Sequence, residues 1–229
     1  MKITFISDTH TKHRFCEHAL PGGDILIHSG DLMNSGWSKR EVIEFLDWFS
    51  EQPYEHKIFI AGNHDRIFEM NPEWVWDLIE KSYKHKVTYL EDEWIEINGV
   101  KIYGTPWQPE FYNWAFNLPR RGEELLEKWQ AIPDDIDILI SHGPAMGYLD
   151  ASGPPYNEPN LGCELLRERI DLIKPKIHVF GHIHGSAGYL FNGSTHFFNA
   201  SILNERYEYR NSPMTIIWNT EGNEVEFLD

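Results

Sequence analysis

The chain has 229 residues, of which 41% are hydrophobic and 24% are charged, a composition typical of soluble globular proteins. Its 36 acidic and 20 basic residues give a formal net charge of −16, which argues against binding to long nucleic acids or anionic membrane surfaces. The two cysteines are too few for a disulfide framework, and no apolar run is long enough to predict a transmembrane helix.

The length fits one domain, and the chain contains no linker, repeat or low-complexity stretch. We therefore expect a single domain over residues 1–229. An acidic residue already stands at position 8, so the N-terminal residues lack the apolar segment of a secretory signal. Together with the low cysteine content, this predicts a cytoplasmic protein.

The first half of the chain alternates short apolar strands with amphipathic helices. Strands are expected at 2–7, 24–28, 57–61, 87–90 and 94–103. Ser38, followed by Glu41 three residues later, predicts the start of a helix over 39–49. A second helix is expected to begin at Pro72 with Asn71 as its cap. Asn98-Gly99 between apolar flanks predicts a hairpin turn.

The second half continues the alternation but contains two long loops. Residues 104–120 hold three prolines and five aromatic residues, and residues 143–160 are rich in glycine and proline. Helices are expected at 123–132 and 161–173, and strands at 136–140 and 176–180. The remaining residues, through 228, predict strands joined by turns at Asn192-Gly193 and Glu221-Gly222.

Five of the expected strands end at side chains that can bind a metal ion. These side chains are Asp8, His10, Asp31, Asn63, His64, His142, His182 and His184. In alternating α/β proteins, functional sites gather just beyond the carboxyl ends of the strands. Imidazole, carboxylate and carboxamide groups without a nearby thiolate suit divalent ions such as Mn, Fe, Zn or Co.

The number of candidate ligands exceeds what one metal ion needs. In Asp8-Thr9-His10 and in His182-Ile183-His184, alternate residues of an extended segment point the same way. Two such pairs, with single ligands from three further strands, are more than a tetrahedral ion requires. The surplus predicts two divalent metal ions.

These blocks resemble those of a known family. Asp8-Thr9-His10, Gly30-Asp31, Gly62-Asn63-His64-Asp65, Ser141-His142-Gly143 and Gly181-His182-Ile183-His184 are similar to the five blocks of the calcineurin-like metallophosphoesterases. Pro106-Trp107-Gln108-Pro109 and Asn199-Ala200-Ser201 resemble the branch of metallophosphoesterase-domain proteins and bacterial cyclic-nucleotide phosphodiesterases. The resemblance implies an α/β fold, a four-layer α-β-β-α sandwich of two mixed sheets flanked by helices.

The resemblance also implies two groups of metal ligands. One ion would be bound by Asp8, His10 and His184, the other by Asn63, His142 and His182, with Asp31 bridging the two. Mn²⁺ is the first expectation for the metal, with Fe, Zn, Co or Ni as alternatives. His64 would face the substrate without binding either ion.

Such a centre has a defined chemistry. Two cations roughly 3.5–4 Å apart polarise a phosphate group and make a metal-bound hydroxide available near neutral pH to attack phosphorus. His64 would stabilise the developing charge or protonate the leaving alkoxide. Asp65 is expected to hold the His64 ring, because such histidines usually donate their second N–H to a carboxylate or a carbonyl, with a helix or turn cap as its alternative role.

Substrate contacts are expected from His13, Trp107 and Tyr112. His13 lies near the first block, and the aromatic residues of loop 104–120 could stack on a nucleobase. Packing of most of these aromatic residues onto the sandwich is the alternative. The glycine- and proline-rich residues 144–160 would form a rim near His142.

The sequence thus predicts a metal-dependent phosphoesterase, with a phosphodiesterase of small substrates such as cyclic nucleotides as the first choice. A phosphomonoesterase is the alternative within the same class. A DNA exonuclease is disfavoured by the net charge of −16. A non-catalytic binding scaffold is disfavoured because no ligand of the blocks is missing. Neither long nucleic acids nor membranes are expected partners, and a homodimer is one option for the assembly.

Overall fold

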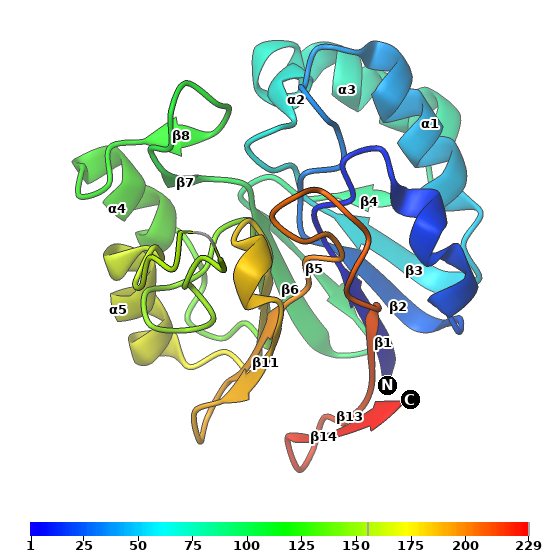
Figure 1. Ribbon diagram of the computed structural model, residues 1–229. Coiled ribbons are helices and arrows are strands. Elements are labelled where there is room, and N and C mark those ends of the chain that lie inside the picture. The colour runs from blue at the N-terminus through cyan, green and yellow to red at the C-terminus, as the bar shows by residue number, and fades with distance from the viewer. Residues whose placement is uncertain (155, 229) are drawn as a thin grey trace.

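Two six-stranded mixed sheets pack face to face in the computed structural model, which describes residues 1–154 and 156–228 (Figure 1). The first sheet contains, in spatial order, β14 (Glu224–Leu228), β13 (Met214–Asn219), β1 (Lys2–Ile6), β2 (Gly23–His28), β3 (Tyr54–Phe59) and β4 (Thr88–Tyr89). The second contains β11 (Gly188–Phe191), β12 (His196–Asn199), β10 (Ile177–Phe180), β9 (Ile138–Ser141), β6 (Val100–Thr105) and β5 (Glu93–Ile97). Pro155, in the expected rim, and Asp229, the last residue of the expected domain, lie outside the described residues.

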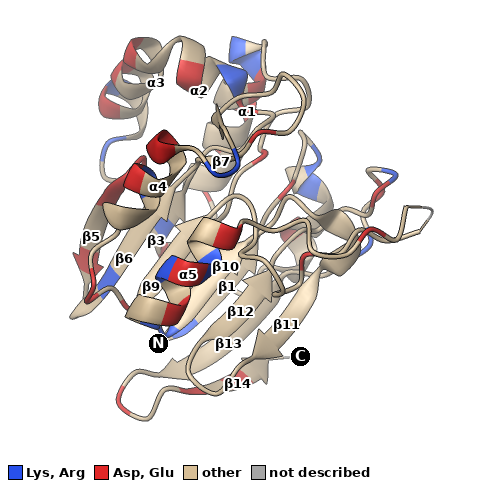
Figure 2. Ribbon diagram, turned by 90° about the vertical axis from the view of Figure 1, so that its left-hand side faces the viewer, with Lys and Arg blue, Asp and Glu red and all other residues tan. Residues whose placement is uncertain are grey.

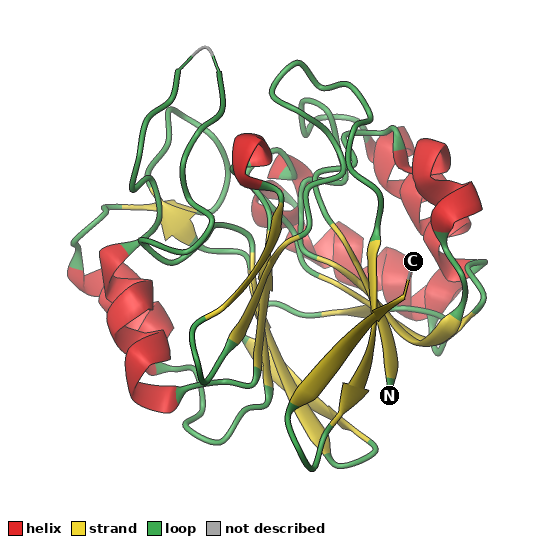
Figure 3. Ribbon diagram, turned by 60° about the horizontal axis from the view of Figure 1, so that its bottom comes forward, coloured by secondary structure: helices red, strands yellow, loops and turns green. Residues whose placement is uncertain are grey.

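Helices cover the outer face of each sheet, which gives four layers (Figure 3). The first sheet is covered by α1 (Lys39–Ser50), α2 (Arg66–Met70) and α3 (Pro72–Leu78), the second by α4 (Glu123–Gln130) and α5 (Glu164–Ile173). A π-helix (Ile79–Tyr83) extends α3, and 3₁₀ helices occupy His13–Ala19 and His184–Ser186. The predicted α-β-β-α sandwich is confirmed.

The central strands are apolar on both faces because both faces are buried. On β2, Ile25 and Ile27 enter the layer between the sheets, whereas Leu26 packs against the helices. Ile138 and Val179 meet the first pair from the opposite sheet. Alternate residues of one strand thus pack into two different apolar cores. Each fully buried large apolar side chain contributes about 1.5–3 kcal/mol to the free energy of unfolding.

Several local predictions are confirmed. The Oγ atom of Ser38 accepts a hydrogen bond from the backbone N–H of Glu41 at 3.4 Å, so Ser38 caps α1. Asn98 and Gly99 connect β5 to β6 with positive φ angles of 51° and 79°, as a tight hairpin turn requires.

Other local predictions differ from the structure. Helix α2 was not predicted from the sequence, because five residues are too few to show a helical period. Loop 104–120 contains a short parallel pair, β7 (Gln108–Pro109) with β8 (Asn117–Leu118). Helix α5 begins three residues later than expected, after Cys163, whose Sγ accepts a hydrogen bond from the N–H of Leu166. Within the described residues, no helix has the length and apolar character needed to span a membrane.

Candidate metal centre

The predicted ligands meet at one edge of the molecule because the parallel strands of both sheets end there. Asp8, Asp31 and Asn63 follow β1, β2 and β3 of the first sheet, while His142 and His182 follow β9 and β10 of the second. An isolated parallel bridge between Ser7 and Ser201 joins the backbone directly beside Asp8 to the segment after β12. The packing of the two sheets therefore gathers residues that lie far apart in the chain.

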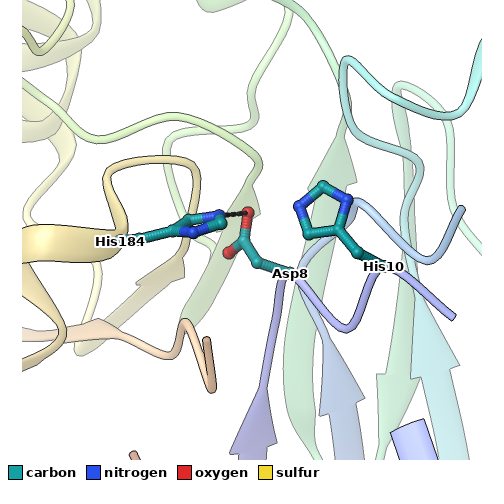
Figure 4. Close-up of side chains that lie close together, drawn as sticks. All are labelled: Asp8, His10 and His184. Carbon is teal, nitrogen blue, oxygen red and sulfur yellow. Dashed lines mark ion pairs between the residues drawn. The ribbon is translucent and has the colours of Figure 1, made fainter. Parts of the chain in front are cut away.

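Short distances connect these side chains. The Nε2 atom of His184 lies 3.3 Å from Asp8 Oδ1, and Figure 4 shows Asp8 between His184 and His10. The Oδ2 atom of Asp31 lies 3.5 Å from His10 Nε2, and its Oδ1 atom lies 3.4 Å from His142 Nε2. Asp31 thus contacts one histidine with each carboxylate oxygen, which is the arrangement that a bridging ligand needs.

Three overlapping groups of ligand atoms could each hold a metal ion. They are Asp8 with His10 and His184, His10 with Asp31 and His64, and Asp8 with Asp31 and His142. The ligand atoms within each group lie within 4.8 Å of one another. Because the groups share members, the ions that they could hold would be close neighbours.

Asn63 and His182 complete the predicted set. The Oδ1 atom of Asn63 lies 2.9 Å from His142 Nε2, and the ring centroids of His182 and His142 are 5.1 Å apart. The backbone N–H of His182 donates to Asp8 Oδ2 at 3.0 Å. All seven predicted ligands therefore come together at this edge.

Three of the histidines are held through their Nδ1 atoms by backbone carbonyl oxygens. The acceptors are the carbonyls of Met33 for His10, of Ser29 for His142 and of Asn204 for His184, at 2.9, 2.9 and 3.0 Å. Donation from Nδ1 leaves Nε2 as the free ring nitrogen that binds a metal. The Nε2 atom of His10 is buried without a hydrogen-bond partner, so these residues fit a cation.

Burial and the mutual charges of the site set the protonation of these groups. Burial lowers the pKa of His10 to about 4 and that of His182 to about 3, which keeps both in the neutral form that binds metals. Burial by itself would raise the pKa of Asp31, but the His142 ring holds it well below the usual range. Burial opposes protonation of His142, but Asp31 raises its pKa to about 9. A metal ion must therefore displace a proton from His142.

Residues outside the predicted set orient Asp8. The Oγ–H of Ser201 donates to Asp8 Oδ2 at 2.7 Å in a fully buried contact. A Cβ atom at position 181 would lie only 2.0 Å from the same oxygen, so Gly181 is required there. Sequence reasoning assigned no role to Ser201, and the one signal for it was the block Asn199-Ala200-Ser201.

The expected contact between Asp65 and the His64 ring is wrong. The Nδ1–H of His64 instead donates to the carbonyl oxygen of Asn34 at 2.5 Å. The Asp65 carboxylate accepts hydrogen bonds from four backbone N–H groups, those of Asp31, Leu32, Met33 and Gly62. Asp65 thus serves backbone N–H groups of the segments that follow β2 and β3. Its role is to hold the segment that carries Asp31.

A cavity of about 550 Å³ opens onto the metal ligands. Its lining includes His10, Asp31, Asn63, His64, His182 and His184. Tyr112, a predicted substrate contact, lies on its rim beside Phe111 and is 78% exposed. Tyr207 also lines the cavity, with ring centroids 4.8 Å from His10 and 5.4 Å from His184. No sequence pattern pointed to Tyr207.

The structure places the other two predicted substrate contacts outside this cavity. His13 is only 4% exposed because its short helix turns the ring onto Trp48, with centroids 4.8 Å apart. The Nε1–H of Trp107 donates to Asp92 at 2.9 Å, and its ring packs edge-on against Phe116. Packing onto the sandwich thus holds Trp107, in line with the alternative raised for loop 104–120.

Comparison with known proteins gives one family and several relatives. The family model for calcineurin-like phosphoesterases matches residues 1–186. Human metallophosphoesterase domain-containing protein 1 is 40% identical over 236 residues, which cover 94% of this chain and 70% of the relative. The Caenorhabditis elegans protein UPF0046 C25E10.12 is 38% identical over 226 residues, 93% of this chain and 79% of the relative.

A solved structure supports the fold. The protein TT1561 of Thermus thermophilus superposes with a TM-score of 0.64 over 100% of this chain and 98% of its own, at 15% sequence identity. At that identity the likeness concerns the arrangement of helices and strands alone. The sandwich that presents the ligands is thus shared with a protein of different sequence.

Proposed function

This chain belongs to the calcineurin-like phosphoesterase family, and we propose that it is a phosphodiesterase that uses two metal ions to hydrolyse small diesters such as cyclic nucleotides. The proposal rests on the clustering of the candidate ligands beside one cavity of about 550 Å³, which His10, Asp31, Asn63, His182 and His184 line. A cavity of this size suits a small molecule, since ligand sites usually measure about 300–1,000 Å³.

The donor set indicates where each ion would bind. Asp8, His10 and His184 would hold one ion, Asn63, His142 and His182 the other, and Asp31 would contact both. Mn²⁺ is the proposed metal, and the imidazole, carboxylate and carboxamide ligands are equally compatible with Fe, Zn, Co or Ni. When bound, the two ions supply Lewis acidity that offsets charge on the phosphate oxygens and makes water a stronger acid.

His64 supplies the proton chemistry. Its Nδ1–H is committed to Asn34, so Nε2 is the ring nitrogen available toward the cavity. A histidine protonated at Nε2 can donate a proton to the leaving alkoxide. The Asn34 carbonyl fixes the ring nitrogen that acts, which prepares the side chain for this task before the substrate arrives.

The charges of the cavity favour a diester over a monoester. Glu110, Glu158 and Glu205 line it, and Arg120 is the one basic Lys or Arg side chain among the described lining residues. The Arg120 guanidinium donates to Glu164 and to the carbonyl oxygens of Leu161 and Gly162, at 2.7–2.8 Å. These hydrogen bonds within the protein leave the Arg120 guanidinium less available to a phosphate group. A diester carries one negative charge, whereas a monoester carries up to two. The acidic side chains that line the cavity therefore repel a diester less than a monoester.

A non-catalytic scaffold and a nuclease each fit the structure less well than a phosphodiesterase. A binding scaffold would not need His64 held in one orientation beside a complete ligand set. A nuclease needs a basic groove, whereas on the face shown in Figure 2 the described acidic and basic residues are interspersed over α4 and α5.

Metal analysis with turnover assays tests the proposal. Protein with Mn²⁺ should bind two ions, hydrolyse bis(p-nitrophenyl) phosphate faster than p-nitrophenyl phosphate, and cleave cyclic nucleotides faster than nucleotide monophosphates. Asp31→Ala should lose at least one ion and nearly all activity. The control Asp135→Ala should lose neither, because Asp135 is exposed and pairs with Lys101. Two tightly bound ions without turnover of any phosphoester would favour the scaffold, and preferred monoester cleavage would favour the phosphomonoesterase.

A further inference from the structure

The His64 ring packs against Trp114, which in turn contacts Arg66. The Trp114 ring lies parallel to the His64 ring, with centroids 4.0 Å apart and an interplanar angle of 22°. The Arg66 guanidinium carbon lies 4.7 Å from the centroid of the Trp114 ring and 5.2 Å from that of the Trp37 ring. Trp114 therefore stacks on His64 and also contacts a cation, the Arg66 guanidinium.

The backbone around Trp114 is tied to the turn that carries His64. The N–H of Ala115 donates to the carbonyl oxygen of Asn63 at 3.0 Å. The N–H of Phe116 donates to the Glu69 carboxylate on α2 at 3.1 Å. Arg66 also donates to the carbonyl oxygen of Asn113. These contacts on both sides of Trp114 fix its position relative to His64.

Trp114 contacts His64 but does not line the cavity. The described residues that line the cavity include His64 but not Trp114. Phe111 and Tyr112 of the same loop do line the cavity. Phe111 and Tyr112 are thus placed to contact a ligand in the cavity, whereas Trp114 contacts His64.

We propose that Trp114, which also contacts the Arg66 guanidinium, is a positioning residue that fixes the ring plane of His64. The hydrogen bond from Nδ1 to Asn34 restrains rotation of the ring about the Cβ–Cγ bond, but only while that one bond is intact. The terminal torsion of histidine is broad, so the ring needs a second constraint. A stacked tryptophan supplies it, because an offset-stacked pair is worth about 0.5–1.5 kcal/mol. The kinetic consequence rests on the function proposed above; the geometric claim does not.

A kinetic double-mutant cycle tests the catalytic part. Trp114→Leu should lower kcat on a cyclic nucleotide roughly 3- to 10-fold, the range that the loss of one stacked pair allows, with little change in KM or metal content. Trp114→Phe should restore most of kcat. In a His64→Ala background, Trp114→Leu should cause no further loss, because its target is gone. An equal loss in both backgrounds would overturn the proposal.

Trp94→Leu is the matched control. Trp94 lies on β5, is 49% exposed and also has a cation, Lys101, over its ring. It has no contact with His64, so this substitution should leave kcat unchanged in both backgrounds. A loss in the control as large as that of Trp114→Leu would show that removal of any surface tryptophan disturbs the enzyme.

Nuclear magnetic resonance of the imidazole nitrogens tests the geometric part without turnover. In ¹⁵N-histidine protein with diamagnetic Zn²⁺, the His64 signals, assigned by their absence in His64→Ala, should show Nδ1 protonated in the wild type and in Trp114→Phe. Trp114→Leu should show averaging between the two nitrogens. Wild-type signals in Trp114→Leu would overturn the inference, even in an active enzyme. Averaged signals in a protein that cleaves no phosphoester would sustain the positioning role and refute the proposed function.

Discussion

The carboxylate of Asp65 accepts a hydrogen bond from the backbone N–H of Asp31 at 2.9 Å, although 34 residues separate the two. The same side chain accepts hydrogen bonds from the N–H groups of Met33 at 2.9 Å and Gly62 at 2.8 Å. One buried carboxylate therefore holds the ends of β2 and β3 together. Its effect on the metal centre is indirect, through the position of the bridging ligand.

Asp65→Asn should destabilise the protein and weaken metal binding together. The amide nitrogen of asparagine must face at least one backbone N–H and leave it unpaired, at a cost of about 1–3 kcal/mol. Urea unfolding and metal titration measure the two effects. The control Asp77→Asn removes only an exposed pair with Lys81 and should change little. A selective loss of His64 chemistry with normal stability would restore the contact that the structure excludes.

Ser201→Ala should lower metal affinity by roughly 10- to 100-fold, as expected for the loss of a hydrogen bond that orients a ligand. The lost contact is the one from Ser201 to Asp8. Isothermal titration with Mn²⁺ measures the change. Ser50→Ala, at an exposed contact with Asp47, is the control. Unchanged affinity in Ser201→Ala would mean that the second hydrogen bond to the same oxygen, from the backbone of His182, is sufficient.

His64→Ala should retain both metal ions and lose kcat by roughly 10²- to 10⁴-fold on nucleotide diesters, the range for loss of a general acid. The loss should be smaller on a p-nitrophenyl ester, because p-nitrophenolate leaves without a proton. Parallel assays on the two substrates and metal analysis check this. Equal losses would indicate stabilisation of phosphate charge, and loss of an ion would place His64 among the ligands, as its proximity to His10 and Asp31 allows.

Small diesters should be cleaved much faster than duplex DNA, with little gain for DNA at low salt. The net charge is −16, so two divalent ions reduce it only to −12 and the protein still repels a long polyanion. Rates measured on bis(p-nitrophenyl) phosphate and on plasmid DNA across a salt series test this. Fast DNA degradation with a steep salt dependence would favour the nuclease alternative.

Stability should fall as the pH is lowered below about 6.5, in part because of His178. This side chain is fully buried between Ser141 and apolar neighbours, and burial lowers its pKa from 6.5 to about 3. Between these values the unfolded chain binds a proton that the folded chain does not, so the contribution is lost as the pH falls, by up to about 1.4 kcal/mol per unit. Urea unfolding between pH 7 and 5 with a chelator should show a slope smaller by one proton in His178→Gln. An unchanged slope would mean that His178 is protonated in the fold.

The sequence by itself, through its resemblance to a family, predicted the fold class that the structure confirms, and it named the candidate ligands. Each expected strand ends where an apolar run meets a polar block, and that boundary is local. Asp8, Asp31 and His142 could therefore be placed at strand ends without knowledge of their neighbours. Because parallel strands end at the same edge of a sheet, the same pattern also predicted that these ligands converge.

Only the tertiary structure decided which residues contact the side chains of the site. Asp65 stands beside His64 in the chain, yet the ring nitrogen of His64 reaches Asn34, and its face meets Trp114 from a loop 50 residues later. Tyr207 and Ser201 come to the site from segments that carry no periodic pattern. The direction of a side chain in a loop is set by the packing of distant segments, and such packing leaves no periodic or local signal in the sequence.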